Sequence, residues 1–340
     1  MKRFAMYIKM ISLTLVCVLL AAAFCSCVNN RVVGTVGEYE VAYDELRFLA
    51  NSYKTSLVEK YGEYETLDDE TKSKFESELR ELVYTNIVTN YAILSLCADE
   101  GLTLEDEDLD KRVDEYMDEL IEGSFGGSRS DYKASMKMYS LTDRYVKFTV
   151  AVDYLYSDLL SKMLESSPVS NDDAKMKEIV KNEFVRTWHI AIFNDEGESV
   201  EDNKSKAIEA LSKLRDGSMT MYKLIGSKYN EDYSITDLDG LYFARGSMNE
   251  DYEKVAFGLE VGEISDIVGL SVTRDNGKAT TAFYIIQRLE IEDAYLDENI
   301  DALRQEYMNS IIYGMLEERK GELSFEPNKY CEELVLAELK

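Results

Sequence analysis

The stretch 239–268, DGLYFARGSMNEDYEKVAFGLEVGEISDIV, predicts a strand, a turn, a helix, a second turn and a second strand in close succession. It opens on a short apolar run and turns at Arg245-Gly246. After a turn at Gly262, a strand is predicted from Ile264. Between the turns, apolar side chains recur at the three-to-four-residue spacing of an amphipathic helix, at Met248, Tyr252, Val255, Ala256 and Phe257. Periodicity alone supports this order of elements and nothing more.

The flanking residues extend this pattern to a small α+β domain. Alternation and β-propensity predict strands over 185–192 and 281–289. Between them, helices are predicted over 201–214, where Asp216-Gly217 closes the helix, and over 219–229. The order strand, helix, helix, strand, helix, strand, strand is typical of an α+β domain.

The first half of the chain is predicted to be helical. Two short β-type runs flank Gly37, and Asp44 is predicted to cap the helix that follows. Further helices are predicted over 72–97, from Thr103, and over 143–164, where Thr142 is the cap. The Gly- and Ser-rich run 123–128 is predicted to be a flexible connector, and the break at 166–170 is the clearest domain boundary. A last amphipathic helix is predicted over 293–320.

The charge of the chain excludes one class of partner. The formal net charge is −28, and it becomes −31 when the first 26 residues, with three cations and no acids, are removed. Such a surface repels phosphate backbones, so no nucleic acid is expected to bind. The acidic surface either attracts cationic unfolded polypeptides or simply keeps the protein solvated.

The first residues are predicted to be a processing segment. Lys2, Arg3 and Lys9 precede an apolar core, 11–24, which is shorter than a membrane span of about 20 residues. Cys27 follows the small Ser26, and this pair resembles the lipobox of bacterial lipoproteins. The resemblance implies lipidation at Cys27 and an extracytoplasmic protein that is lipid-anchored to the bacterial cell membrane. A plain secretory signal is the alternative.

The remaining cysteines and the single histidine limit the chemistry. Cys97 is predicted to be a buried thiol, and a Cys97–Cys331 bridge stays open for an oxidising compartment. His189 is the only histidine, and no nucleophile-elbow motif accompanies it, which argues against a serine hydrolase. No metal site and no cofactor are expected, because zinc sites need several His or Cys residues. With 66 acidic residues, carboxylate pairs arise by chance.

Several motifs across 185–290, about a third of the chain, stand in the order found in parvulin-type (PpiC-type) peptidyl-prolyl isomerase domains. RTWHI at 186–190 matches the opening strand R-A-x-H-I, and YNED at 229–232 resembles Y-S-x-D. DG at 216–217 with KLI at 223–225 resembles G-x-x-F-x-x-L-A. RGSM at 245–248 and GEIS at 262–265 match closely, and FYII at 283–286 matches Y-H-I-I except at one residue.

This resemblance implies roles for individual residues. His189, Asp232 and Tyr284 would be the catalytic polar groups, with Tyr284 in the place of the family's second histidine. The substrate's proline ring would be bound by a set of apolar residues, namely Leu241, Phe243, Met248, Tyr252 and Phe257. The alternative for Met248 and Tyr252 is core packing, and the alternative for His189 is a structural, hydrogen-bonded strand histidine.

The chain also departs from the family pattern. A tyrosine at 284 donates a hydrogen bond but does not reproduce an imidazole pair. The usual G-D-L-G-x-F segment reads LDGLYF at 238–243, Ile267 replaces a proline, and an extended hairpin with its turn at 275–277 is predicted after Val268. We expect these changes to affect isomerase activity more than the parvulin-like fold.

The helical part resembles the N-terminal chaperone domain of SurA-like and PrsA-like secreted foldases, on VGEYEV at 36–41 and TLED at 103–106. The expected architecture is an α+β fold, in which a helical SurA-like domain is completed by a C-terminal helix and is joined to a small parvulin-like domain with an antiparallel sheet. The expected domains are a lipoprotein signal peptide over 1–26, a helical chaperone-like domain over 27–168, a linker helix over 169–184, a parvulin-like domain over 185–291 and a returning C-terminal helix over 292–340.

The expected function is that of a membrane-anchored extracytoplasmic foldase whose partners are unfolded or partly folded secreted polypeptides, with a homodimer left open. The departures from the family pattern leave isomerase activity uncertain. One alternative is a non-catalytic peptide-binding chaperone, and another is an envelope scaffold that handles no clients.

Overall fold

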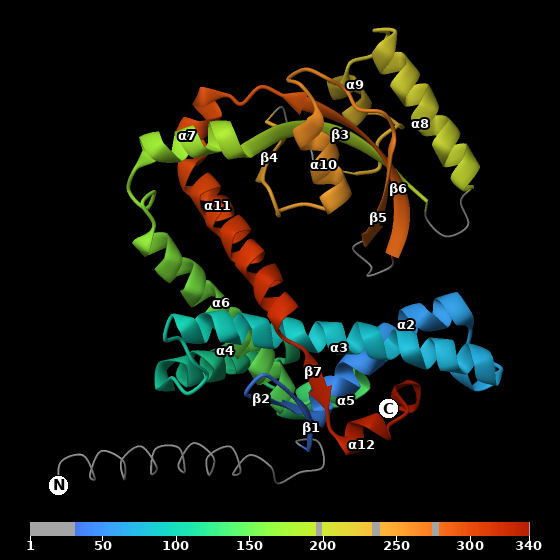
Figure 1. Cartoon of the computed structure of the whole chain (residues 1–340), viewed down its shortest axis with the longest axis vertical. Helices are drawn as coiled ribbons and strands as arrows, with labels where there is room; N and C mark the ends of the chain where they lie inside the picture. Colours follow the sequence, from blue (N-terminus) through green and yellow to red (C-terminus); the bar gives the residue numbers. More distant parts are fainter. Residues whose placement is uncertain (1–30, 195–198, 233–238, 274–278, 340) are drawn as a thin grey trace. The chain divides into compact units, whose positions relative to one another are not determined.

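The computed structural model describes residues 31–194, 199–232, 239–273 and 279–339, and the chain forms two compact units (Figure 1). Unit 1 comprises Met1–Leu159 and Leu316–Lys340, and unit 2 comprises Leu160–Met315. The predicted signal peptide and Cys27 lie outside the described residues, and so does the predicted turn at 275–277. Mixed helices and antiparallel sheets confirm the predicted α+β fold class.

Unit 1 combines the first helices of the chain with its last residues. Its elements before unit 2 are β1 (Val32–Val36), β2 (Tyr39–Ala42), α2 (Tyr43–Tyr61), η3 (Tyr64–Thr66), α3 (Asp69–Asp99), α4 (Glu107–Phe125), α5 (Arg129–Met138) and the first part of α6 (Asp143–Ser166). After unit 2, it takes the end of α11 (Asp293–Glu322), then β7 (Phe325–Pro327), α12 (Lys329–Glu332) and η4 (Leu336–Glu338).

Side-chain caps determine where several of these helices begin. The Thr142 hydroxyl accepts a hydrogen bond from the Tyr145 N–H at 3.1 Å, so this predicted cap is confirmed. The prediction that Asp44 caps helix α2 is wrong, because α2 begins at Tyr43 and Asp44 lies buried in its first turn. Likewise, α4 begins after Asp106, which caps it, and not at Thr103.

The predicted flexible connector 123–128 is a compact helix junction. Helix α4 continues to Phe125, Gly126 and Gly127 adopt positive φ, and Ser128 caps α5. Helix α5 was not predicted from the sequence.

The end of the chain closes the sheet of unit 1. Strand β7 pairs antiparallel with β1, which gives the order β2-β1-β7. The two backbones approach closely at Gly34, where a Cβ atom would lie 2.4 Å from the carbonyl oxygen of Glu326. Further along, the Glu76 carboxylate accepts hydrogen bonds from the backbone N–H groups of Leu336 and Ala337.

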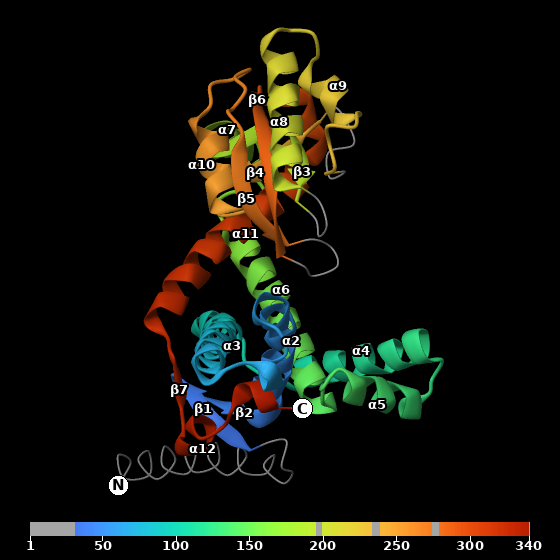
Figure 2. The same ribbon diagram turned by 90° about the vertical axis from the view of Figure 1, so that its right-hand side faces the viewer.

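Unit 2 contains a four-stranded antiparallel sheet in the order β4-β3-β6-β5. Helix α10 packs on one face and α8 and α9 pack on the other, as Figure 2 shows. Between the rest of α6 and the start of α11, the elements are α7 (Asp173–Glu183), β3 (Phe184–Phe193), α8 (Val200–Arg215), α9 (Met221–Ile225), β4 (Leu241–Ala244), α10 (Glu250–Gly258), β5 (Val268–Thr273) and β6 (Ala279–Leu289).

Two predicted elements of unit 2 are shorter in the structure. The helix expected over 219–229 ends at Ile225, where the Ser227 hydroxyl donates to the Leu224 carbonyl at 2.7 Å and competes with the helical bond. The strand expected from Ile264 is a single bridge to Gln287, and β5 begins only at Val268. There Ser265 bonds to Ile286 through both its backbone and its hydroxyl, which interrupts the regular ladder.

Cys97 and Cys331 are both free and buried, so the bridge left open by the sequence is absent. The Cys97 thiol faces the Leu155 carbonyl, whereas Cys331 faces Tyr84. Because Tyr84 and Cys97 are both in α3, the rise of about 1.5 Å per residue separates the two places by about 20 Å. Burial raises the pKa of Cys97 to about 12, which makes it an inert thiol.

Within the described ranges, the structure has no helix that is both long enough and apolar enough to span a membrane.

Candidate functional site

Strand β3 places two polar side chains on one face of the sheet of unit 2. Successive side chains of a strand point to opposite faces, so Thr187 and His189 lie toward α10, while Trp188 and Ile190 lie toward α8 and α9. His189 is only 3% exposed. A buried imidazole requires hydrogen-bond partners.

Both ring nitrogens of His189 have a partner. Nδ1 lies 2.8 Å from the hydroxyl of Tyr252 in α10, and Nε2 lies 3.1 Å from Oδ2 of Asp232. The same tyrosine hydroxyl lies 2.9 Å from the hydroxyl of Thr187. One row of polar groups therefore runs Thr187, Tyr252, His189, Asp232.

The start of α10 fixes the position of Tyr252. The Asn249 side chain accepts hydrogen bonds from the N–H groups of Asp251 and Tyr252, which caps the helix. The Glu253 carboxylate accepts from the N–H groups of Gly246 and Met248 and so ties down the preceding loop. Tyr252 is 2% exposed, and this burial raises its pKa well above the ordinary tyrosine value.

Asp232 is held beside the edge of β3 by the two residues before it. The Asn230 amide oxygen accepts from the N–H of Ala191 at 3.0 Å and from the N–H of Asp232 at 3.2 Å. The N–H of Glu231 donates to the Ala191 carbonyl at 2.8 Å, and its carboxylate accepts from Phe193. The Asp232 side chain keeps 19% exposure, so it is the member of the row that solvent reaches most easily.

Tyr284 completes the cluster from the neighbouring strand. It pairs with Ala191 across the ladder between β3 and β6, which puts its ring diagonal to His189. Its ring centroid lies 5.1 Å from that of His189 and 5.8 Å from that of Tyr252, both in edge-to-face geometry. The three residues predicted as catalytic, His189, Asp232 and Tyr284, are thus brought together.

The donors along this row can be assigned for an ionised Asp232 and a neutral imidazole. An ionised carboxylate only accepts hydrogen bonds, so the proton between His189 and Asp232 lies on Nε2. In a neutral imidazole Nδ1 then accepts, and Tyr252 donates its O–H to it. Thr187 donates in turn to the tyrosine oxygen. All three hydrogen bonds therefore point the same way, toward Asp232.

The predicted proline-binding residues divide into a buried set and an exposed set. Phe243 and Tyr252 are buried in one core cluster with Ala256 and Leu259, so core packing, the alternative named for Tyr252, describes both in this structure. Leu241 and Phe257 pack at the border of that cluster and are partly exposed. Met248 is 37% exposed in the loop before α10.

Sequence reasoning missed three contributions to this site. The hydroxyl of Thr187, the hydroxyl of Tyr252 and the amide of Asn230 all act through contacts between different elements. A signal was present for one of them, because Thr187 stands where the family motif has alanine. No local pattern indicates that Tyr252 would face it.

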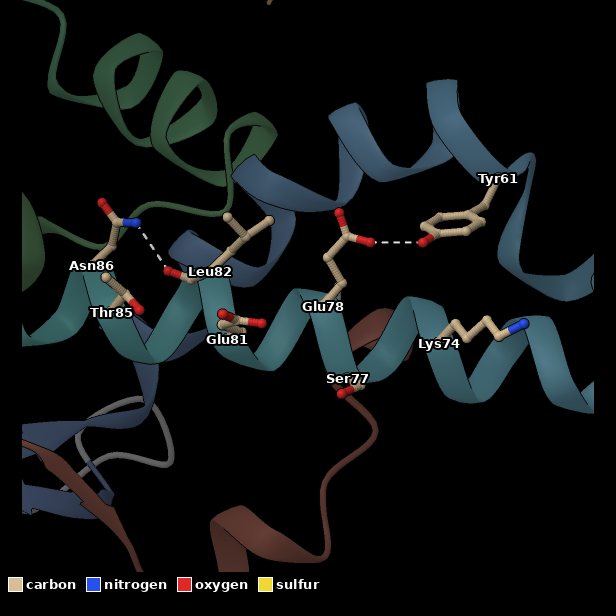
Figure 3. Close-up of a pocket in the computed structure, with 8 residues that line it drawn as sticks. All are labelled: Tyr61, Lys74, Ser77, Glu78, Glu81, Leu82, Thr85 and Asn86. Carbon is tan, nitrogen blue, oxygen red and sulfur yellow. Dashed lines mark hydrogen bonds between the residues drawn. The ribbon is translucent and has the colours of Figure 1, made fainter. Parts of the chain in front are cut away.

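Two hollows in unit 1 lie outside this cluster. One, of about 680 Å³, is lined by Tyr61, Lys74, Ser77, Glu78, Glu81, Leu82, Thr85 and Asn86. Its central carboxylate is already engaged, because Glu78 accepts from the Tyr61 hydroxyl at 2.7 Å (Figure 3) and from Lys60. The other hollow, of about 450 Å³, lies beside Tyr39, and its lining includes the apolar residues Leu94, Ala98, Leu102 and Leu104. Among the described residues, no group of three or more His, Cys, Asp or Glu side chains is arranged to hold a metal ion.

Comparison with known proteins finds foldases. No family model matches the chain. It is 22% identical over 256 residues to foldase protein PrsA of Oceanobacillus iheyensis, which covers 71% of this chain and 78% of that protein. It is 25% identical over 162 residues to foldase protein PrsA of Staphylococcus aureus, which covers 47% of this chain and 48% of that protein. The chain thus spans about half the length of this staphylococcal relative.

Among solved structures, the crystal structure of foldase protein PrsA from Streptococcus pneumoniae aligns with a TM-score of 0.32 and 15% identity, over 86% of this chain and 92% of that one. A TM-score this low establishes no common arrangement of the whole chain. The sequence relatives confirm the predicted resemblance to PrsA-like foldases.

Proposed function

We propose that this protein is an extracytoplasmic foldase that assists secreted polypeptides and that unit 2 catalyses prolyl cis-trans isomerisation. The similarity to proteins named foldase PrsA supports the first part. The observation that carries the second part is the meeting of His189, Asp232 and Tyr284, from three separate segments of the chain, beside Tyr252. Acyl chains on Cys27 hold the protein to the outer side of the membrane, a proposal that rests on the sequence at 25–27.

Prolyl isomerisation needs few chemical groups. The amide rotates over a barrier of about 18–20 kcal/mol, and no covalent bond breaks. An enzyme therefore needs an apolar seat for the ring and polar groups placed for the twisted amide. Leu241, Met248 and Phe257 offer apolar surface, and Asp232 offers a carboxylate at the exposed end of the polar row.

A refolding reaction limited by a proline tests this proposal. Wild-type protein is expected to shorten a slow phase that otherwise lasts tens to hundreds of seconds. Asp232→Ala is expected to lose at least about tenfold of that acceleration, because removal of one positioned polar group commonly costs about 100-fold or more. The matched control is Asp266→Ala, which removes an 86% exposed carboxylate whose partner Arg215 is 59% exposed, and which should accelerate refolding like wild type.

The proposal of catalysis fails if wild type and Asp232→Ala both give the rate measured without protein. That result would favour the second candidate, a chaperone whose parvulin-like domain holds peptide without catalysis. Two observations favour this candidate: Tyr284 occupies the place of a second histidine, and His189 is buried among its partners. Wild-type protein would then still suppress the aggregation of an unfolded client.

A further inference from the structure

The buried tyrosine beside the only histidine has a feature that core packing does not require. A phenylalanine would fill the same space among Phe243, Ala256 and Tyr284. The hydroxyl of Tyr252 is instead buried and carries two partners on β3, Thr187 and His189. These partners lie two residues apart on one strand, so a single hydroxyl reaches both.

The surroundings of His189 fix the orientation of its imidazole ring. The groups that face it are the Tyr252 hydroxyl at Nδ1, the Asp232 carboxylate at Nε2 and the edge-to-face rings of Tyr252 and Tyr284. Rotation of the ring by half a turn about its bond to Cβ would break both hydrogen bonds. The hydroxyl on one side and the carboxylate on the other therefore fix the ring's orientation together.

We propose that Tyr252 is a positioning residue, whose O–H donates to Nδ1 of His189, holds the imidazole as the Nε2–H tautomer and directs that proton to Asp232. The effect on a substrate passes through Asp232, because the tyrosine itself is 2% exposed and the imidazole 3%. The histidine orients the carboxylate, and the carboxylate meets the peptide. This inference rests on the proposed function for its role in catalysis, while the orientation of the ring rests on the geometry and the tautomer on that geometry together with an ionised Asp232.

The single histidine makes the proposal directly measurable. Full-chain protein labelled with ¹⁵N-histidine gives one pair of ring-nitrogen resonances, and the bare nitrogen of a neutral ring is well separated from the protonated one. At a pH of about 9, above the ordinary histidine range, wild type is expected to show a protonated Nε2 and a bare Nδ1. A wild-type spectrum with the proton on Nδ1 would overturn the proposal without any variant.

Tyr252→Phe removes the hydroxyl and keeps the ring. The two nitrogen shifts are expected to move toward each other as the Nδ1–H tautomer becomes populated, and kcat/KM in proline-limited refolding is expected to fall about three- to tenfold, the equivalent of one net hydrogen bond. Tyr229→Phe is the matched control. Its ring is also buried in unit 2, but its hydroxyl bonds to Glu209 in α8, so both readouts should stay at wild-type values.

The outcomes separate this inference from the proposed function. Unchanged nitrogen shifts in Tyr252→Phe would overturn the positioning role whatever the activity. Changed shifts in a protein whose wild type has no isomerase activity would retain the positioning of Asp232 by Tyr252 and His189 and would reject catalysis. If the nitrogen shifts of Tyr252→Phe change and its kcat/KM equals that of wild type, the hydrogen bond from Tyr252 to His189 acts only on structure. The proposed positioning role in catalysis is then wrong.

Discussion

Asp44 and Glu45 are sequence neighbours at the start of α2, and both are fully buried in unit 1. Asp44 pairs with the guanidinium of Arg144 and accepts from the Thr142 hydroxyl, so its charge is compensated. Glu45 has fewer hydrogen-bond partners: its Oε2 accepts from the Tyr91 hydroxyl at 2.9 Å, while its Oε1 is buried without a hydrogen-bond partner. Burial raises the pKa of Glu45 to about 7.

A raised pKa makes this carboxyl a source of pH-dependent stability. In the unfolded chain a glutamate ionises near its ordinary pKa of about 4.3, so between about pH 4.3 and 7 the folded state holds a proton that the unfolded state has lost. The contribution of Glu45 is therefore full below the unfolded pKa and is lost as the pH rises through about 7. Relative to Glu45→Gln, the unfolding free energy of wild type should fall by about 2–3 kcal/mol from pH 5 to pH 7.5.

Urea denaturation followed by far-UV circular dichroism at several pH values measures this difference. Glu40→Gln is the control for the loss of a glutamate carboxylate, because the Glu40 side chain is exposed on β2. A wild-type-minus-Glu45→Gln difference that is constant over this range would show that Glu45 is ionised in the folded protein at pH 5.

At the level of single residues, sequence reasoning found three residues of the cluster but not the polar groups that hold them in place. His189, Asp232 and Tyr284 were identified through ordered motifs, and the structure places them together. The hydrogen bonds that link Thr187, Tyr252 and His189 depend on the packing of helix α10 on strand β3, which no local pattern encodes. Asp44 was misread for the same reason, since its partner Arg144 is 100 residues away.

At the level of elements, strands and long helices could be predicted where packing reinforces periodicity. Strand β3, helix α8 and helix α11 agree with their predicted ranges to within one or two residues. Short elements were predicted less well: the helix that is α9 was predicted too long, and the three-residue strand β7 was not predicted, because such segments have too little sequence for a periodic signal. Strand β7 exists because β1 offers an unpaired edge, and that edge comes from the other end of the chain.

Gly34 provides a test of this strand pairing. In Gly34→Ala, the added Cβ meets the Glu326 carbonyl at 2.4 Å and the Phe325 ring at 2.6 Å, so β7 must move away from β1. The stability of unit 1 should fall by about 1–3 kcal/mol, the usual cost of overpacking. Unfolding of unit 1 is followed by circular dichroism, because most of its residues are helical.

The only tryptophan, Trp188, lies in unit 2 and reports on that unit separately. Its fluorescence transition should stay at the wild-type denaturant concentration in Gly34→Ala. Gly269→Ala is the matched control in unit 2, where an added Cβ has no heavy atom within 4 Å. Equal shifts of the circular dichroism and fluorescence transitions in Gly34→Ala would contradict a local effect on unit 1.

At the level of the whole molecule, unit 1 is built from two parts of the chain, and unit 2 is inserted between them. The sheet of unit 2 begins and ends at one place, because Arg186 and Leu289 are partners in the antiparallel ladder between β3 and β6. Partners in such a ladder have Cα atoms about 4.5–5.5 Å apart. A few glycine and serine residues therefore suffice to join 184 to 291 when 185–290 is removed.

This deletion separates holding of clients from isomerisation. Without 185–290 the protein should lose all acceleration of proline-limited refolding, because His189, Asp232 and Tyr284 are gone, while unit 1 keeps its strands β1, β2 and β7 and its apolar hollow beside Tyr39. We expect it to retain at least about half of the wild-type suppression of client aggregation, measured by light scattering at equal molar concentration, since the hollow beside Tyr39 still offers apolar side chains to an unfolded chain. Full-length Asp232→Ala, which keeps unit 2, serves as the control for loss of catalysis alone. Complete loss of suppression in the deletion variant, with its circular dichroism still helical, would instead place client binding in the removed domain.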